Sequence, residues 1–227
     1  MSGEHWERGF FRVGSAIEFV VRPFLTVHID VQEPLPEGAI LMAANHHSFV
    51  DMLVSTICCC RLQRPTRFIV SQAFFAKPGL GRILRNIGCI AGGRKSGADV
   101  VAAEAIRSGA SVAIMPEGKV TVLESGHVLA PLLPGVATIW STVACPFVAV
   151  GIAGADEVWP KGRLPRGPRR RSRRPVVYVR VAPPEIGTDG GRTLERVAEI
   201  MEANCVASES SRLALAALAA PAAASRP

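Results

Sequence analysis

The stretch AILMAANHHSFVDMLVSTICCC, residues 39–60, decides the fold. Its first six residues are apolar and predict a short buried strand, and residues 52–60 predict a buried helix. Between them, residues 45–51 form the densest polar cluster inside otherwise apolar sequence. A strand that opens into a polar loop before a helix is the usual place for chemistry in an α/β protein.

Outward from this stretch, segments with strand and helix patterns alternate along the chain. We expect further strands at residues 25–31, 67–70, 89–91, 112–115, 146–152 and 176–181, and helices at 80–85, 97–108, 135–143 and 193–207. This alternation predicts an α/β fold, with a twisted, largely parallel or mixed sheet flanked by helices.

The start of the chain has a helical pattern of its own. Apolar residues recur at steps of three and four, at Trp6, Phe10, Val13, Ile17, Val20 and Phe24. Arginines lie off this stripe, which suits an amphipathic helix lying in a membrane interface. A helix packed on the domain's own core fits the same pattern.

The charge of the chain is unevenly distributed. Its 227 residues have a formal net charge of +7, and eight Lys or Arg without any acid fall in residues 161–174, so that the remainder carries −1. Such a segment attracts nucleic acid or anionic membranes. Because it has no aromatic residue to stack on bases, we favour lipid headgroups over nucleic acid; a solvated loop without a partner remains the alternative.

Composition limits where the protein works. The hydrophobic fraction, 48%, excludes a wholly disordered chain. Six cysteines without a C-x-x-C pair predict reduced, mostly buried thiols in a cytosol-facing protein. The first residues lack the pattern of a signal peptide. Residues 128–155 are uncharged, but prolines and glycines interrupt them, so we expect no membrane span there.

The polar cluster offers two interpretations. Ser48 and Asp51 are spaced as an N-cap and its capping-box partner. Alternatively, if His46 lies in the loop and Asp51 in the first helical turn, the carboxylate can fix the tautomer of the imidazole and make its other nitrogen a general base. A metal site of His46, His47 and Asp51 is a weaker alternative, since it lacks further ligands nearby.

The sequence resembles the glycerolipid acyltransferases of the lysophosphatidic acid acyltransferase family in four blocks. Residues 45–51 match its N-H-x-S-x-x-D block, and residues 68–93 followed by Arg94 are similar to its second, glycine-to-arginine region. Residues 115–118, MPEG, resemble its F-P-E-G block, and Pro146 with the following FVAV resembles the fourth. Four blocks in the right order are a strong signal.

The resemblance implies transfer of a fatty acyl group from coenzyme A or acyl carrier protein to a lipid hydroxyl. His46 would be the general base and Asp51 would orient it. Asn45 and Ser48 would hold the loop. No covalent acyl-enzyme is implied, and no G-x-S-x-G elbow is present in the sequence.

The resemblance places acceptor binding on four further residues. Arg94 would hold a phosphate with its guanidinium fork, and Glu117 and Gly118 would line the acceptor pocket. The family continues its third block with T-R-S, where this chain has Lys119, Val120 and Thr121. The arginine is therefore lost, and Lys119 can supply a cation only as a point charge.

These inferences give the following expectations. Residues 1–23 form a membrane-associating helix, residues 24–208 the acyltransferase domain with a basic loop at 161–174, and residues 209–227 an Ala-rich tail. The acceptor expected is 1-acyl-sn-glycerol-3-phosphate, giving phosphatidic acid in phospholipid biosynthesis; another lysolipid or aminolipid acceptor, or a catalytically silent lipid-binding homologue, is the alternative. The partners are membrane lipids and acyl-CoA or acyl carrier protein, with no other cofactor, no metal and no nucleic acid. We expect a peripheral or monotopic protein at the cytoplasmic face of the membrane.

Overall fold

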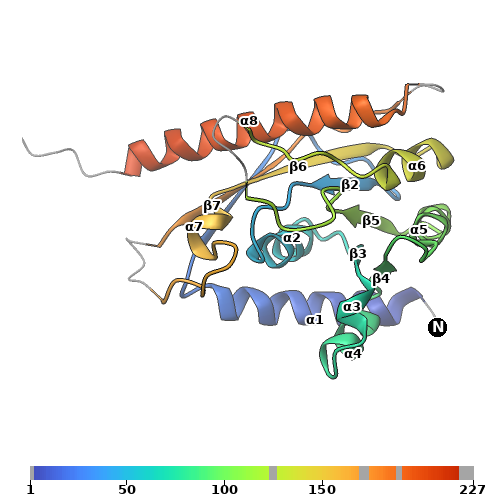
Figure 1. Cartoon of the computed structure of the whole chain (residues 1–227), viewed down its shortest axis with the longest axis horizontal. Coiled ribbons are helices and arrows are strands. Elements are labelled where there is room, and N and C mark those ends of the chain that lie inside the picture. The colour runs from blue at the N-terminus through green and yellow to red at the C-terminus, as the bar shows by residue number, and fades with distance from the viewer. Residues whose placement is uncertain (1–2, 123–126, 169–173, 188–190, 220–227) are drawn as a thin grey trace, which may run out of the picture.

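The computed structural model describes residues 3–122, 127–168, 174–187 and 191–219 (Figure 1). Its elements in chain order are α1 (Gly3–Val21), β1 (Thr26–Val31), β2 (Leu41–Ala44), α2 (Val50–Arg61), β3 (Thr66–Ser71), α3 (Gln72–Phe75), α4 (Leu80–Asn86), β4 (Ile90–Gly92), α5 (Ala98–Arg107), β5 (Ser111–Ile114), α6 (Gly135–Thr142), β6 (Phe147–Ala153), α7 (Ala155–Val158), β7 (Val176–Val181) and α8 (Leu194–Ala219). Each strand and helix expected from the sequence is present; α3 and α7, four residues each, were not expected.

Seven strands form one mixed sheet in the order β1-β7-β6-β2-β5-β3-β4. Neighbouring strands are parallel except β6 and β7, which are antiparallel. The predicted twisted mixed α/β sheet is thus confirmed. Because β2, β5 and β6 are parallel, their carboxyl ends meet at one edge, which we call the site edge.

Helices cover both faces of the sheet (Figure 1). The core divides accordingly: Ile40, Met42 and Ala44 pack with α2 on one face, and Leu41 and Ala43 pack with α5, α6 and α8 on the other. This alternation follows from the pleat of a strand, which points successive side chains to opposite faces. All residues of β6 are buried, as expected for a central strand covered on both sides.

Helix α1 packs against α2 and α4 with most of its apolar stripe. Phe10 is fully buried in the core, and Trp6, Val13 and Ile17 pack against that core. At the contact with α2, a Cβ on Gly14 would clash with the Sγ of Cys60, so glycine permits the close approach of the two helices. The stripe therefore takes the second of the two arrangements compatible with the sequence, packing on the domain's own core.

The last helix crosses the boundary expected at residue 208. Helix α8 is continuous from Leu194 to Ala219, and Arg212, beyond that boundary, pairs with Glu157 at 2.8 Å and with Glu209. The first part of the Ala-rich tail is thus a packed helix, while residues 220–227 lie outside the described residues.

The structure describes only part of the predicted basic loop, since residues 169–173 lie outside the described residues. No helix within the described ranges is long and apolar enough to cross a membrane. The six cysteines are free thiols, and Cys58, Cys59, Cys145 and Cys205 are buried.

Candidate active site

The candidate site begins where β2 ends, at the site edge. Asn45 is the first residue after the strand and is fully buried. Its side-chain oxygen accepts the N–H of Ile152 at 2.7 Å, and its side-chain nitrogen donates to the carbonyl of Ile152 at 2.9 Å. This pair of hydrogen bonds joins the loop after β2 to the end of β6 and fixes the orientation of the Asn45 amide. Asn45 is thus bonded across the sheet edge in a way that can hold the loop.

His46 and Asp51 are in contact, as the catalytic interpretation requires. Nδ1 of His46 lies 3.2 Å from Oδ2 of Asp51, across the turn that enters α2. The same oxygen accepts the backbone N–H groups of His47 and Ser48, each at 2.7 Å. An ionised carboxylate oxygen can only accept hydrogen bonds, so Nδ1 of His46 carries the proton of the neutral ring and Nε2 is left as the basic nitrogen.

Ser48 completes the local structure at the start of α2. Its hydroxyl oxygen accepts the N–H of Val50 at 3.1 Å, while Asp51 accepts the N–H of Ser48. Only the bond from the Ser48 N–H to Asp51 is that of a capping box, because the Ser48 hydroxyl accepts the N–H of Val50 and not that of Asp51. The Ser48 hydroxyl also donates to the carbonyl of Trp159 at 2.9 Å, which ties the turn to the segment after α7. Asp51 thus both holds the turn that enters α2 and orients His46.

Glu117 connects the loop after β5 to the histidine. Its Oε1 accepts the backbone N–H of His46 at 2.7 Å, and the N–H of Thr121 donates to the carbonyl of His46 at 2.9 Å. The backbone of His46 is therefore held on both sides by the third block. Such a second layer of contacts fixes a catalytic group more firmly than its own loop can.

His47, to which the sequence assigned no role, lies between Asn45 and Glu117. The side-chain nitrogen of Asn45 lies 3.2 Å from Nδ1 of His47. Because Ile152 fixes the Asn45 amide, that nitrogen is a donor and Nδ1 must be an acceptor. The proton of a neutral His47 is then on Nε2, which lies 3.7 Å from Oε1 of Glu117 and has no hydrogen-bond partner among the described residues.

Two buried carboxyl groups thus flank His46, the candidate catalytic base. Burial raises the pKa of the Asp51 carboxyl above its ordinary value, and the hydrogen bonds from His46 and from the backbone oppose this in part. Burial likewise raises the pKa of Glu117, against the bond from the His46 backbone. Oδ1 of Asp51 and Oε2 of Glu117 are buried and have no partner among the described residues.

The third block, residues 115–121, contains a sharp turn that leaves some of its side chains exposed and others buried. Gly118 has a φ of 70°, and its N–H donates to the carbonyl of Met115 at 3.0 Å, closing a turn. Lys119 is exposed, whereas Val120, where the family's arginine would stand, is buried in the core. Lys119 is therefore the cation that this block presents, between two residues bonded to the His46 backbone.

Arg94 is more remote from the histidine. It is exposed in the loop after β4, at the same edge of the sheet as His46. In the strand order, β4 is three positions from β2, which corresponds to about 14 Å between strand axes. Hydrogen bonds and side-chain contacts bring together Asn45, His46, Ser48, Asp51 and Glu117, whereas Arg94 shares only their edge of the sheet.

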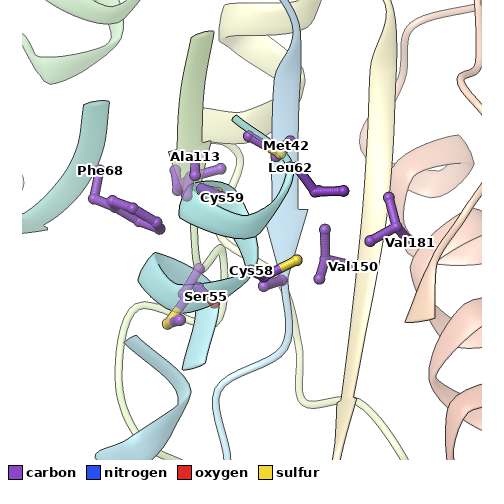
Figure 2. Close-up of a pocket in the computed structure, with 12 residues that line it drawn as sticks. Met42, Ser55, Cys58, Cys59, Leu62, Phe68, Ala113, Val150 and Val181 are labelled. Atoms are coloured by element: carbon purple, nitrogen blue, oxygen red, sulfur yellow. The ribbon is translucent and has the colours of Figure 1, made fainter. Parts of the chain in front are cut away.

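A small apolar cavity lies beneath α2, away from these polar groups (Figure 2). Its volume is about 20 Å³, and its walls are side chains of α2 and the sheet, including Ser55, Cys58 and Phe68. This is enough space for about one water molecule and far too little for an acyl chain. None of the candidate site residues lines it, so it belongs to the core.

Sequence reasoning missed the roles of His47 and Trp159. The contact of Ser48 with Trp159 spans 111 residues, and that of Asn45 with Ile152 spans 107. Nothing local marks such partners. The only signal was position, because Trp159 and Ile152 belong to segments that end at the same edge as β2.

Comparisons with known proteins agree with this geometry. A family model described as Acyltransferase matches residues 26–153, which is more than half of the chain. A solved structure, the 1-acyl-sn-glycerophosphate (LPA) acyltransferase PlsC from Thermotoga maritima, is similar with a TM-score of 0.65 and 19% identity. The match covers 94% of this chain and 79% of that one, and it supports the fold. No curated protein sequence matches the chain.

Proposed function

The chain belongs to the acyltransferase family and is an acyltransferase, and from this premise we propose that it acylates the hydroxyl of a lysophospholipid with a fatty acyl thioester. The observation that carries the proposal is the contact of His46 Nδ1 with Asp51 Oδ2 at 3.2 Å. This contact leaves Nε2 of His46, on a side chain that is 19% exposed, as the base.

The proposed reaction is a direct transfer. Nε2 of His46 takes the proton of the acceptor hydroxyl as its oxygen attacks the thioester carbonyl, and Asp51 stabilises the imidazolium. The tetrahedral intermediate then collapses, the C–S bond breaks, and the thiolate leaves. The imidazolium returns its proton to the thiolate, so the products are an ester and a free thiol. The enzyme ends in its starting protonation state.

The proposed acceptor is 1-acyl-sn-glycerol-3-phosphate, and the product is phosphatidic acid. Lys119, between Glu117 and Thr121, supports a negatively charged acceptor group close to His46. Arg94 supplies a second cation at the same edge, and its guanidinium can bind two phosphate oxygens. Because the strand axes are about 14 Å apart, the side chain of Arg94 must extend toward His46 to reach such a phosphate.

We further propose that the enzyme works as a peripheral or monotopic protein at the cytoplasmic face of a membrane, with acyl-CoA or acyl carrier protein as donor. Both substrates of the proposed reaction support this placement, since the acceptor is a membrane lipid and the donor thioesters are water-soluble. The family match and the exposed cations of the site edge agree with it.

An acceptor screen tests the proposal. The purified protein is assayed with labelled acyl-CoA and acyl carrier protein against lysophosphatidic acid, lysophosphatidylcholine and a lyso-aminolipid. We expect transfer to lysophosphatidic acid to exceed transfer to the others. Lys119→Ala and Arg94→Ala should raise KM for the phosphate-bearing acceptor by about tenfold each, since an ionic hydrogen bond contributes about 1.5 kcal/mol, with little change for an acceptor without an exposed phosphate.

The control for these variants is Lys95→Ala, which removes the exposed cation next to Arg94 in the sequence and should leave KM unchanged. Equal use of all three acceptors by the parent, or equal loss with all three in the Lys119 and Arg94 variants, would remove the phosphate from the proposal. Transfer to the aminolipid alone would assign the alternative acceptor.

A further inference from the structure

The site edge gathers more than the catalytic residues. Strand β7 is antiparallel to β6, and β1 is parallel to β7, so the amino ends of β1 and β7 lie at the edge where β6 and β2 end. The carboxyl end of α1, which leads into β1, therefore lies there too. The end of α1 and α7 are found on the same side of the molecule, on the left in Figure 1.

The end of α1 exposes large apolar side chains beside arginines. Phe19 is 80% exposed and Val20 is 62% exposed, although the rest of the helix packs its apolar stripe inward. Next to them is a cavity of about 170 Å³ whose charged walls are Glu18, Arg22, Arg61 and Arg174. Glu18 pairs with Arg61 at 2.6 Å, so three arginines and one glutamate give this cavity a net formal charge of +2.

The segment after α7 forms a second exposed tip. The N–H of Arg166 donates to the carbonyl of Val158 at 2.9 Å, and Nε1 of Trp159 donates to the carbonyl of Arg163 at 2.9 Å. These bonds close a loop over residues 158–166 that holds Leu164 outward, 87% exposed. Lys161, Arg163 and Arg166 are exposed around it.

This second tip is attached to the active site. The carbonyl of Trp159 accepts the Ser48 hydroxyl at 2.9 Å, and the ring of Trp159 lies 5.5 Å from that of Phe49. The acids that precede the loop, Asp156 and Glu157, lie in α7, and Glu157 is paired with Arg212. The loop thus presents an apolar tip, Leu164, among cations. Through Trp159 it is in direct contact with the turn that carries His46.

Single exposed apolar residues need no explanation, but two tips at one edge, each flanked by cations, are the composition of a membrane-interface surface. We propose that the site edge docks on an anionic bilayer. Phe19, Val20 and Leu164 enter the interfacial region, and the arginine-lined cavity binds the phosphate of a lipid headgroup. In this orientation α1 enters the bilayer by its carboxyl end, because its apolar stripe is already buried in the protein.

Vesicle binding tests the surface directly. Wild-type protein is compared with Leu164→Asp, Phe19→Asp and Arg22→Ser on phosphatidylcholine vesicles with and without phosphatidylglycerol. We expect wild type to prefer the anionic vesicles, Leu164→Asp and Phe19→Asp to bind at least about tenfold more weakly, and Arg22→Ser about fivefold more weakly, as expected for one cation near an anionic surface. The matched control is Ile186→Asp, which is 77% exposed after the carboxyl end of β7, at the opposite edge, and should bind as wild type does.

This inference relies on the proposed function only for the choice of a lipid acceptor, and the assay separates the two. With an acceptor embedded in vesicles, Leu164→Asp should lose turnover in parallel with binding; with a short-chain acceptor dissolved as monomers, it should match wild type. Wild-type vesicle binding by Leu164→Asp, equal losses in Ile186→Asp, or indifference to phosphatidylglycerol would overturn the docking surface. An absence of turnover with every acceptor, together with the expected vesicle binding, would overturn the proposed function and leave the surface standing.

Discussion

The Oδ2 atom of Asp51 is shared by Nδ1 of His46 at 3.2 Å and by two backbone N–H groups, those of His47 and Ser48, at 2.7 Å each. One carboxylate oxygen therefore holds the turn that enters α2 and orients the candidate catalytic base. The backbone bonds keep Oδ2 in place whether or not the imidazole is protonated. This arrangement links the start of a helix to the chemistry proposed for the site.

Replacing Asp51 with Asn separates these two functions. The amide oxygen can still accept both backbone N–H groups, so we expect the fold to persist with a change in the free energy of unfolding of about 1 kcal/mol. The charge that stabilises the imidazolium is lost, so kcat should fall by a factor on the order of 10²–10⁴. Thermal unfolding and steady-state kinetics measure the two effects. A variant that unfolds would show that the fold needs the charge of Asp51, and one that keeps wild-type kcat would show that catalysis does not; either result contradicts the separation of the two functions.

The raised pKa values of Asp51 and Glu117 predict how stability depends on pH. A carboxyl group whose pKa is raised on folding binds its proton more tightly in the folded state, so its stabilising contribution is present below its ordinary pKa and is lost as pH rises through the raised value. In the double variant Asp51→Asn/Glu117→Gln this loss should disappear. Urea unfolding from about pH 4 to 8 tests this as the free energy of unfolding of wild type minus that of the double variant, which should fall as pH rises. If this quantity stays constant or rises with pH, the assignment is contradicted.

The tautomer deduced for His47 can be observed. Asn45 and Ile152 require an unprotonated Nδ1, so nitrogen NMR of the free protein should show His47 as the Nε2–H form. His47→Phe keeps the ring volume but removes contact with Asn45 and Glu117. We expect kcat to fall only about fivefold, because one hydrogen bond that positions the loop is lost. A loss as large as that of a His46 variant would instead make His47 part of the chemistry.

Much of this structure could be predicted from the sequence because it is periodic or local. The apolar runs of β2 and β6 and the helix that follows residue 49 are local patterns, and the spacing of His46 and Asp51 permits their contact across one turn. The contacts that complete the site join residues far apart in the sequence. Glu117 contacts the backbone of His46 across 71 residues, and neither segment's own sequence determines the strand order that brings them together. The direction of the α1 stripe was likewise undecidable, because a core and a membrane interface select the same apolar spacing.

Ser55 carries a prediction about the core beneath α2. Its hydroxyl is buried in the wall of the cavity in Figure 2 and has no hydrogen-bond partner among the described residues. An unsatisfied buried hydroxyl costs about 1–3 kcal/mol, so Ser55→Ala should raise the free energy of unfolding by about 1 kcal/mol. Chemical denaturation measures this change, with Ser208→Ala as the contrasting variant that should be destabilised, because the buried Ser208 hydroxyl donates to the carbonyl of Gly151 at 3.0 Å. Destabilisation by Ser55→Ala would show that the hydroxyl is satisfied in solution, by a water in the cavity.

The role of His46 as general base is the central claim, and the acyl-transfer rate of His46→Ala tests it most directly. The variant is compared with wild type and with His5→Ala, which removes an exposed histidine from the far end of α1. Each protein is assayed with the best acceptor of the screen, after thermal unfolding has confirmed that all three are folded. We expect kcat of His46→Ala to fall by a factor on the order of 10²–10⁴, while kcat of His5→Ala matches that of wild type. A folded His46→Ala protein that turns over at the wild-type rate would contradict it.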